Sequence, residues 1–83
     1  MKYFKIIAWD NCPFCIKARE LLVENEEPVE FCSVDNAKEL LEHYKTIYSH
    51  KTVPIIVLKE AGVDDKFIGG YTDLVEFIAK RSP

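Results

Sequence analysis

The spacing of hydrophobic and polar residues changes from segment to segment along the chain, and each spacing predicts a different element. Apolar residues on both faces of residues 2–8 indicate a strand in the middle of a sheet. The β-branched run at residues 54–58 indicates another strand that is buried on both faces. Residues 29–34 alternate and predict a third strand, and residues 66–68 predict a short last strand behind a turn-rich loop at residues 59–65.

Three other segments have apolar residues at helical spacing. A helix over residues 13–24 begins with a proline, which suits a first turn because its missing N–H would have no partner there. Asn36 and Glu39 have the spacing of a capping box, which predicts a helix from that point to about residue 48. A final helix is predicted from residue 72 or 73. The residues predicted to face inward are Ala18, Leu21 and Leu22 in the first helix, Ala37, Leu40, Leu41, Tyr44, Ile47 and Tyr48 in the second, and Leu74, Phe77 and Ile78 in the third.

The elements follow the order strand, helix, strand, helix, strand, strand, helix. The first three form a unit whose strands should be parallel with a right-handed crossover, and the rest adds an antiparallel hairpin and a closing helix. This order predicts an α/β fold, with a four-stranded mixed sheet flanked by three helices. Because 83 residues have room for one hydrophobic core, we expect a single domain over residues 1–83.

Charge and hydropathy exclude several classes of function. The net charge is −3, and basic residues form no run longer than the pair at residues 80–81, so we expect no nucleic-acid partner. No apolar stretch approaches the ~20 residues of a membrane helix. The apolar start of the chain is interrupted by Lys5 and is followed by no cleavage site, so we expect no secretory leader. We therefore expect a cytoplasmic protein without a membrane partner.

The cysteines carry the strongest chemical signal. Cys12 and Cys15 form a CPFC segment between a predicted strand and a predicted helix, which is the context of a redox dithiol. The unpaired N–H groups and positive dipole end of a helix start stabilise a thiolate, so Cys12 is the predicted nucleophile. Cys15 lies one turn further on the same helix face, which permits a disulfide, and it is the predicted resolving thiol.

The cysteines could instead bind zinc or serve as buried apolar residues. A structural zinc site needs four ligands, and His43 and His50 are seven residues apart, outside the usual spacing, so we expect no metal. The third cysteine, Cys32, is interpreted as a small buried apolar residue.

Three segments together resemble the signatures of dithiol glutaredoxins. They are CPFC at residues 12–15, TVP at residues 52–54 and GGYTD at residues 69–73, and they lie in the family's order along essentially the whole chain. The resemblance implies a thioredoxin-like fold and a glutathione-dependent thiol–disulfide oxidoreductase. It implies Cys12 and Cys15 as the catalytic pair, glutathione as co-substrate and no tightly bound cofactor.

The resemblance also implies how glutathione is bound. Pro54 should follow a cis peptide bond, so that the backbone of Val53 pairs with the glutathione backbone. Lys51 is expected to bind the glycine carboxylate. The helix start at Thr72 and Asp73 is expected to bind the γ-glutamyl carboxylate, and Asp73 to pair with the α-amino group. Thr72 or Asp73 could instead cap the helix, and both roles can hold together. The implied glutathione-binding residues are Phe14, Lys51, Thr52, Val53, Pro54, Gly70, Tyr71, Thr72 and Asp73.

The chain departs from the family pattern near the nucleophile. Phe14 stands where the family usually has a tyrosine, so the hydroxyl is lost. Trp9 stands where many members have Lys or Arg, and Asp10 follows it. A missing cation and an added carboxylate both disfavour a thiolate, unless Lys17 reaches back to compensate. Trp9 either stacks over the site or is a half-buried aromatic residue at a strand end.

The resemblance implies glutathionylated and disulfide-containing proteins as partners of a monomeric enzyme, with ribonucleotide reductase as one candidate. Two alternatives stay open. One is a thioredoxin-like protein that a reductase reduces, which the TVP and GGYTD segments disfavour. The other is a dimer that holds an iron–sulfur cluster through Cys12 and glutathione, which Pro13 disfavours because cluster-binding members tend to have Gly or Ser there.

Overall fold

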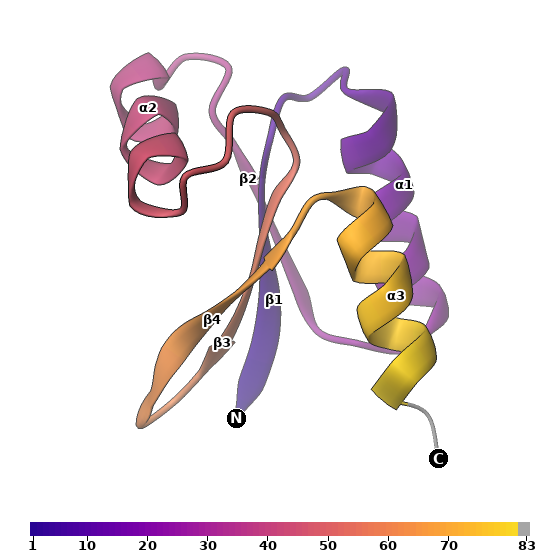
Figure 1. Ribbon diagram of the computed structural model, residues 1–83. Coiled ribbons are helices and arrows are strands. Elements are labelled where there is room, and N and C mark those ends of the chain that lie inside the picture. Colours follow the sequence, from indigo (N-terminus) through magenta and orange to yellow (C-terminus); the bar gives the residue numbers. More distant parts are fainter. Residues whose placement is uncertain (82–83) are drawn as a thin grey trace.

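The computed structural model describes residues 1–81 and has the predicted order of elements (Figure 1). The elements are β1 (Lys2–Ala8), α1 (Pro13–Glu24), β2 (Val29–Ser33), α2 (Lys38–Ile47), β3 (Ile55–Glu60), β4 (Val63–Gly69) and α3 (Tyr71–Arg81). None of the helices within residues 1–81 is both long and apolar enough to cross a membrane.

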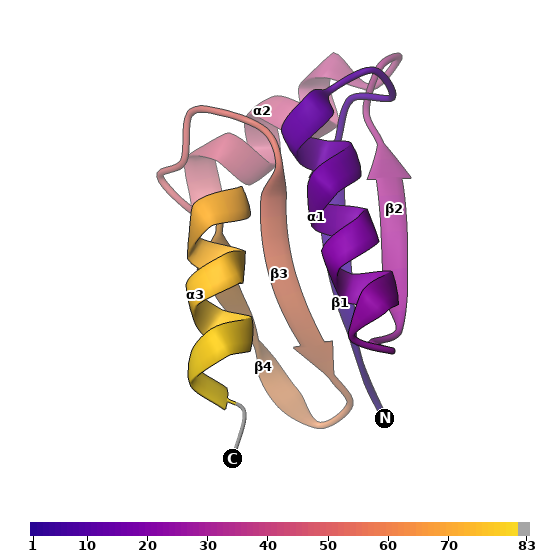
Figure 2. The same cartoon turned by 90° about the vertical axis from the view of Figure 1, so that its right-hand side faces the viewer.

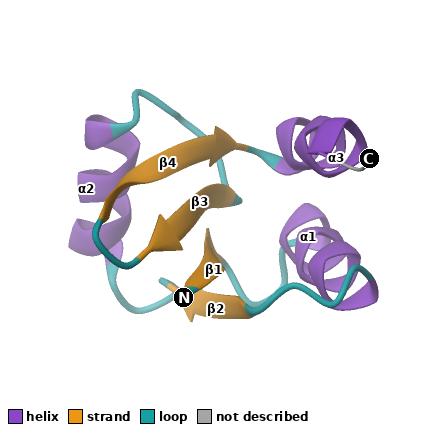
Figure 3. Ribbon diagram, turned by 90° about the horizontal axis from the view of Figure 1, so that it is seen from below, coloured by secondary structure: helices purple, strands orange, loops and turns teal. Residues whose placement is uncertain are grey.

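The four strands form one mixed sheet in the order β2-β1-β3-β4. β1 pairs parallel with β2 and antiparallel with β3, and β3 pairs antiparallel with β4. Seen along the strands, α1 and α3 cover one face of the sheet and α2 covers the other (Figure 3). This arrangement confirms the predicted fold class, and it places the start of α1 at the end of the central strand β1.

The apolar side chains pack in two layers, one on each face of the sheet. Phe4, Ile6 and Ile56 point towards α1 and α3, where they meet Leu22 and Leu74. The neighbouring positions of the same strands point the other way and meet α2; these are Ile7, Ile55 and Val57, which pack with Val34 and Leu41. Because β1 and β3 bury both faces, their sequences show continuous apolar runs rather than alternation.

The predicted start and inner face of α2 are partly wrong. Ala37 is the N-cap residue and makes no side-chain hydrogen bond, so the capping box of Asn36 and Glu39 does not form. The helix starts one residue later than that box requires, which moves Glu39 to the second helical position. Leu40 and Ile47 are 41% and 51% exposed. The sheet is contacted by a narrower stripe at residues 37, 41, 44 and 48.

The predicted loop at residues 59–65 is also wrong. β3 continues to Glu60 and β4 begins at Val63, so the connection is a tight turn in which Gly62 has a positive φ of 80°. The polar residues of this region belong to the part of the hairpin that extends past α2 (Figure 1), where most of the side chains are exposed to solvent. There Lys59 Nζ pairs with Asp65 Oδ2 across the hairpin at 2.9 Å.

Candidate active site

Cys12 lies where the chain leaves β1 and turns into α1. The backbone N–H of Cys12 donates to the carbonyl of Trp9 at 3.3 Å, which closes this turn. Cys12 is the N-cap residue, and its Sγ accepts a hydrogen bond from the backbone N–H of Cys15 at 3.3 Å. The first turn of α1 has Pro13 at its start and no acidic side chain. The half-buried sulfur therefore lies at the positive end of the helix dipole without a competing carboxylate in that turn.

Cys15 differs from Cys12 in burial. Its side chain is fully buried among the residues that α1 and α3 pack against the sheet. This burial, reinforced by the hydrogen bond with Cys12, raises the pKa of the Cys15 thiol to about 12. No disulfide joins the two cysteines in this structure. The pair thus combines one accessible sulfur with one thiol that stays protonated at neutral pH.

A hollow of about 230 Å³ lies beside the pair, and we call it the Tyr71 hollow. It is lined by Phe14, His50, Thr52, Val53, Pro54, Gly70, Tyr71, Thr72 and Asp73. These residues come from the start of α1, the segment before β3 and the start of α3, which meet at one end of the sheet (Figure 2). The Val53–Pro54 bond is cis, as the resemblance implied. The hollow brings together every residue of the implied glutathione site except Lys51.

A second hollow of about 330 Å³ contains Lys51, and we call it the Trp9 hollow. It is lined by Trp9, Asn11, Cys12, Pro13, Lys45, Lys51, Thr52 and Val53. Trp9 follows the last residue of β1, and its side chain, which is 47% exposed, forms a wall of this hollow. Cys12 therefore lines the Trp9 hollow but not the Tyr71 hollow, and the two hollows share Thr52 and Val53.

The start of α3 is capped by its own side chain. Asp73 Oδ2 accepts a hydrogen bond from the backbone N–H of Gly70 at 3.0 Å. A β-carbon added at Gly69 would collide with the Asp73 carboxylate, and Gly69 has a positive φ of 126°. Glycine at position 69 therefore makes this cap possible. The capping role of Asp73 is observed, and its role towards a ligand stays a prediction.

The aromatic and cationic residues near Cys12 contact one another. The rings of Phe14 and Tyr71 are 5.8 Å apart, and they join the first turns of α1 and α3. The ammonium of Lys17 lies 5.5 Å from the centre of the Phe14 ring, which belongs to the first turn of α1. Cys32 is half-buried rather than fully buried, and it packs on the α2 side of the sheet, opposite Cys15.

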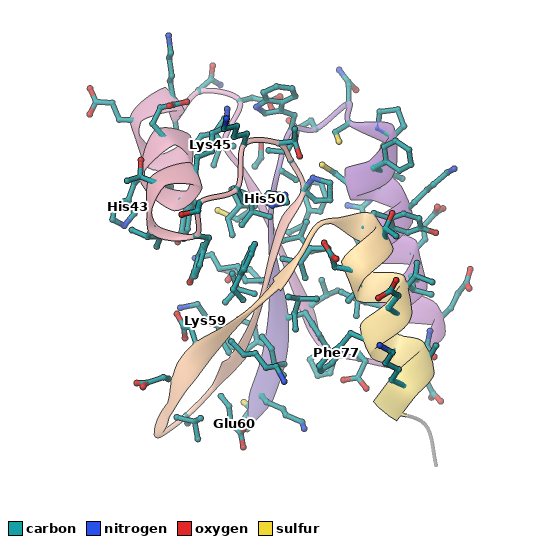
Figure 4. The ribbon with its side chains drawn as sticks, viewed as in Figure 1. His43, Lys45, His50, Lys59, Glu60 and Phe77 are labelled. Carbon is teal, nitrogen blue, oxygen red and sulfur yellow. The ribbon has the colours of Figure 1, made fainter. Side chains whose placement is uncertain are left out.

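His50 is the site residue that sequence reasoning missed. Its ring packs edge-on against Phe67 at 5.5 Å, and its Nε2 lies 3.5 Å from Thr52 Oγ1. It points from the segment before β3 towards the start of α3, whereas His43 lies on the outside of α2 (Figure 4). The only available signal was its place directly before the KTVP segment. Within residues 1–81, no cluster of three or more His, Cys, Asp or Glu side chains could hold a metal ion.

A thioredoxin-like fold with a cysteine pair at a helix start defines a dithiol–disulfide oxidoreductase. The family model described as Glutaredoxin matches residues 2–68, and the chain belongs to the glutaredoxin family. A comparison with curated protein sequences gave no significant match.

Solved glutaredoxins share the fold. Glutaredoxin 1 from Francisella tularensis, in complex with cacodylate, has a TM-score of 0.75 at 26% identity, covering 96% of this chain and 95% of its own. Reduced Escherichia coli glutaredoxin has a TM-score of 0.67 at 26% identity, covering 95% of both chains. A dithiolic glutaredoxin from Trypanosoma brucei brucei has a TM-score of 0.72 at 26% identity, covering 95% of this chain and 79% of its own. The chain is thus a disulfide oxidoreductase.

Proposed function

We propose that this glutaredoxin reduces glutathione mixed disulfides and protein disulfides, with glutathione as reductant. The observation that carries the proposal is the pairing of an accessible sulfur, Cys12, with a protonated buried thiol, Cys15, beside the Tyr71 hollow. An attacking thiolate must reach its substrate, whereas a resolving thiol should stay inert until the mixed disulfide has formed.

The first reaction uses Cys12 alone. Its thiolate attacks the glutathione sulfur of a mixed disulfide, and the protein thiolate leaves and takes up a proton. Glutathione is then carried on Cys12. A second glutathione thiolate attacks that sulfur, which releases oxidised glutathione and restores Cys12.

The second reaction uses both cysteines. Cys12 attacks one sulfur of a protein disulfide, and the other sulfur leaves as a thiol. Cys15 then gives up its proton and attacks the Cys12 sulfur, which releases the reduced protein and leaves a Cys12–Cys15 disulfide. Two glutathione molecules reduce this disulfide in turn.

The proposed glutathione contacts are those that the resemblance to glutaredoxins implies, and the residues that would make them line the two hollows. The γ-glutamyl carboxylate binds the first N–H groups of α3, because these have no partner within the helix. The α-amino group pairs with Asp73, the cysteinyl backbone with Val53, and the glycine carboxylate with Lys51. Lys51 lines the Trp9 hollow, the start of α3 lines the Tyr71 hollow, and Val53 lines both. With these contacts glutathione would extend over both hollows.

Two serine variants test the division of labour. We expect Cys15→Ser to keep the removal of glutathione from mixed disulfides and to lose the reduction of protein disulfides, while Cys12→Ser loses both. The measurement is a coupled assay that follows oxidised glutathione with each substrate class. Cys32→Ser is the matched control, because Cys32 lies on the other face of the sheet, and it should behave as wild type. Equal loss of both activities in Cys15→Ser would contradict the two routes.

The choice of reductant has its own test. We expect glutathione to reduce the Cys12–Cys15 disulfide faster than a thioredoxin reductase does, and the opposite order would favour the thioredoxin-like alternative. We also propose that the protein acts as a monomer in the cytoplasm, because three cysteines, two of them in one CPFC segment, do not form the disulfide framework of a small secreted domain. Disulfide-containing enzymes such as ribonucleotide reductase are candidate partners.

A further inference from the structure

Glutathione, bound as proposed, would fill only a small part of the Trp9 hollow. Its volume of about 330 Å³ corresponds to a width of roughly 7 Å, which is the length of about two extended residues. A glycine carboxylate would occupy only part of that space. The hollow reaches Cys12, so whatever binds in it lies next to the reacting sulfur.

The charges of the hollow are all of one sign. Lys45 from α2 and Lys51 from the segment before β3 line it, and no lining residue carries a carboxylate. Lys51 has no ion-pair partner within residues 1–81. Lys45 has only an exposed partner in its own helix, Glu42, at 3.5 Å, and such pairs are weak. The lining of the hollow is therefore positive on a protein whose net charge is −3.

Trp9 supplies the apolar part of the hollow. A tryptophan that is 47% exposed beside the nucleophile offers a large, rigid contact surface, and aromatic residues of this kind often dominate protein recognition. Asp10, which follows it along the chain, does not line the hollow.

We propose that the Trp9 hollow is a docking subsite for disulfide-containing polypeptides that carry an acidic residue within about two positions of the cysteine that Cys12 attacks. The acidic side chain pairs with Lys45 and Lys51, and the adjoining segment packs on Trp9. This inference names the partner class for the dithiol half of the proposed function, and it does not depend on glutathione.

The reaction through this subsite balances without another reagent. The Cys12 thiolate attacks the peptide sulfur next to the acidic residue, the peptide disulfide breaks, and the second peptide sulfur leaves and takes up a proton. Cys15 then loses its proton and attacks the Cys12 sulfur, so the protein dithiol is oxidised and the peptide is released as a dithiol.

The test compares two peptides in a single turnover without glutathione. Both contain the same intramolecular Cys-Gly-Ser-Cys disulfide, flanked in one by glutamates and in the other by lysines. Reduced protein is mixed with excess peptide, the reaction is stopped with an alkylating agent, and the oxidised protein is counted by mass spectrometry. We expect the glutamate peptide to react about tenfold faster, with the difference shrinking at high salt.

A charge reversal within the hollow should remove this preference. We expect Lys45→Glu to bring the ratio of the two rates close to one or below it. Lys38→Glu is the matched control, because it makes the same change in net charge on the same helix but outside the hollow, and it should keep most of the preference. A wild-type ratio near one, or the same ratio in Lys45→Glu and Lys38→Glu, would overturn the proposal.

A binding measurement covers the case in which a variant folds poorly. Trp9 is the only tryptophan of the chain, so its fluorescence reports on the hollow directly. We expect a glutamate peptide with both cysteines replaced by serine to change this emission in wild type, and its lysine counterpart to change it several-fold less. An emission that neither peptide alters at millimolar concentration would contradict docking. Because these experiments contain no glutathione, a failure of glutathione dependence would leave their outcome unchanged.

Discussion

The starts of α1 and α3 lie at the same end of the sheet (Figure 2). Both helix starts have backbone N–H groups without a partner in the helix, and different side chains accept from these groups at the two starts. At α1 the N-cap side chain of Cys12 accepts from the N–H of the third helical residue, Cys15, at 3.3 Å. At α3 the third helical residue, Asp73, accepts from the N–H of the N-cap residue, Gly70, at 3.0 Å. These are the two halves of a capping box, divided between two helices.

The difference between the two caps shows that the reactive group lies at the start of α1. At α3 a permanent carboxylate occupies the cap, and the arrangement holds the helix in place. At α1 the accepting atom is a sulfur, and the residue that would supply a carboxylate in a complete box is instead the buried thiol Cys15. The dipole of α1 is therefore left to stabilise negative charge on Cys12, which is the charge that disulfide exchange requires.

The sharpest prediction from this comparison concerns Cys15. Burial raises the pKa of the Cys15 thiol to about 12 from the ordinary value of 9.0, so this thiol is far less ionised at pH 8 than an exposed cysteine is. We expect iodoacetamide at pH 8 to label Cys12 and to leave Cys15 almost unlabelled, as peptide mass spectrometry would show. Labelling of Cys15 should increase about tenfold with each pH unit as far as the folded state persists.

Burial and hydrogen bonding can be separated in the same experiment. In Cys12→Ser the thiol partner is gone but the burial of Cys15 remains, so we expect Cys15 to stay slow. In urea-unfolded protein both cysteines should react alike. If folded Cys15 reacted at the rate of an unfolded cysteine, the contrast between the two thiols would be wrong.

A second prediction removes the space that the α3 cap requires. Gly69→Ala puts a methyl group against the Asp73 carboxylate at a positive φ, so it costs both backbone strain and the hydrogen bond to Gly70. We expect the free energy of unfolding to fall by about 3 kcal/mol in urea denaturation. Gly62→Ala is the control, because Gly62 also has a positive φ but nothing within 4 Å, and it should cost only about 1 kcal/mol. Equal costs would show that the cap adds nothing.

The sequence predicted most where one physical signal dominated. The apolar runs of β1 and β3 and the CPFC segment at a strand–helix junction were confirmed, because burial on both faces and a thiol at a helix start leave few alternatives. The antiparallel hairpin was predicted, but the extension of its two strands into residues 59–65 was missed because strands that extend beyond the core have the polar composition of a loop. The capping box of α2 failed by one residue, since a turn ending at Ala37 decides where that helix starts. His50 belongs to no pattern, and only the fold brings it near Gly70.

A third prediction separates the two roles of Asp73. In Asp73→Asn the amide oxygen can still accept from the Gly70 N–H, but the charge is lost. We expect stability to change by less than about 0.5 kcal/mol while KM for a glutathione mixed disulfide rises about tenfold, or 1.4 kcal/mol. In Asp73→Ala both quantities should change, with a stability loss of about 1 kcal/mol. Unchanged KM in Asp73→Asn would leave Asp73 as a cap alone.

The smallest effect is expected at His50, which lines the Tyr71 hollow opposite the start of α3. Its Nε2 lies near Thr52 Oγ1, and a side chain at Gly70 would come within 3.7 Å of it, so the imidazole is close to where the γ-glutamyl carboxylate is proposed to bind. We expect His50→Gln to raise KM for the mixed disulfide about threefold with kcat unchanged, because the contact is equal in the bound substrate and the transition state. His43→Gln, on the outside of α2, should leave KM as in wild type (Figure 4). If kcat fell instead, His50 would act on the reacting sulfur and not on the bound end of glutathione.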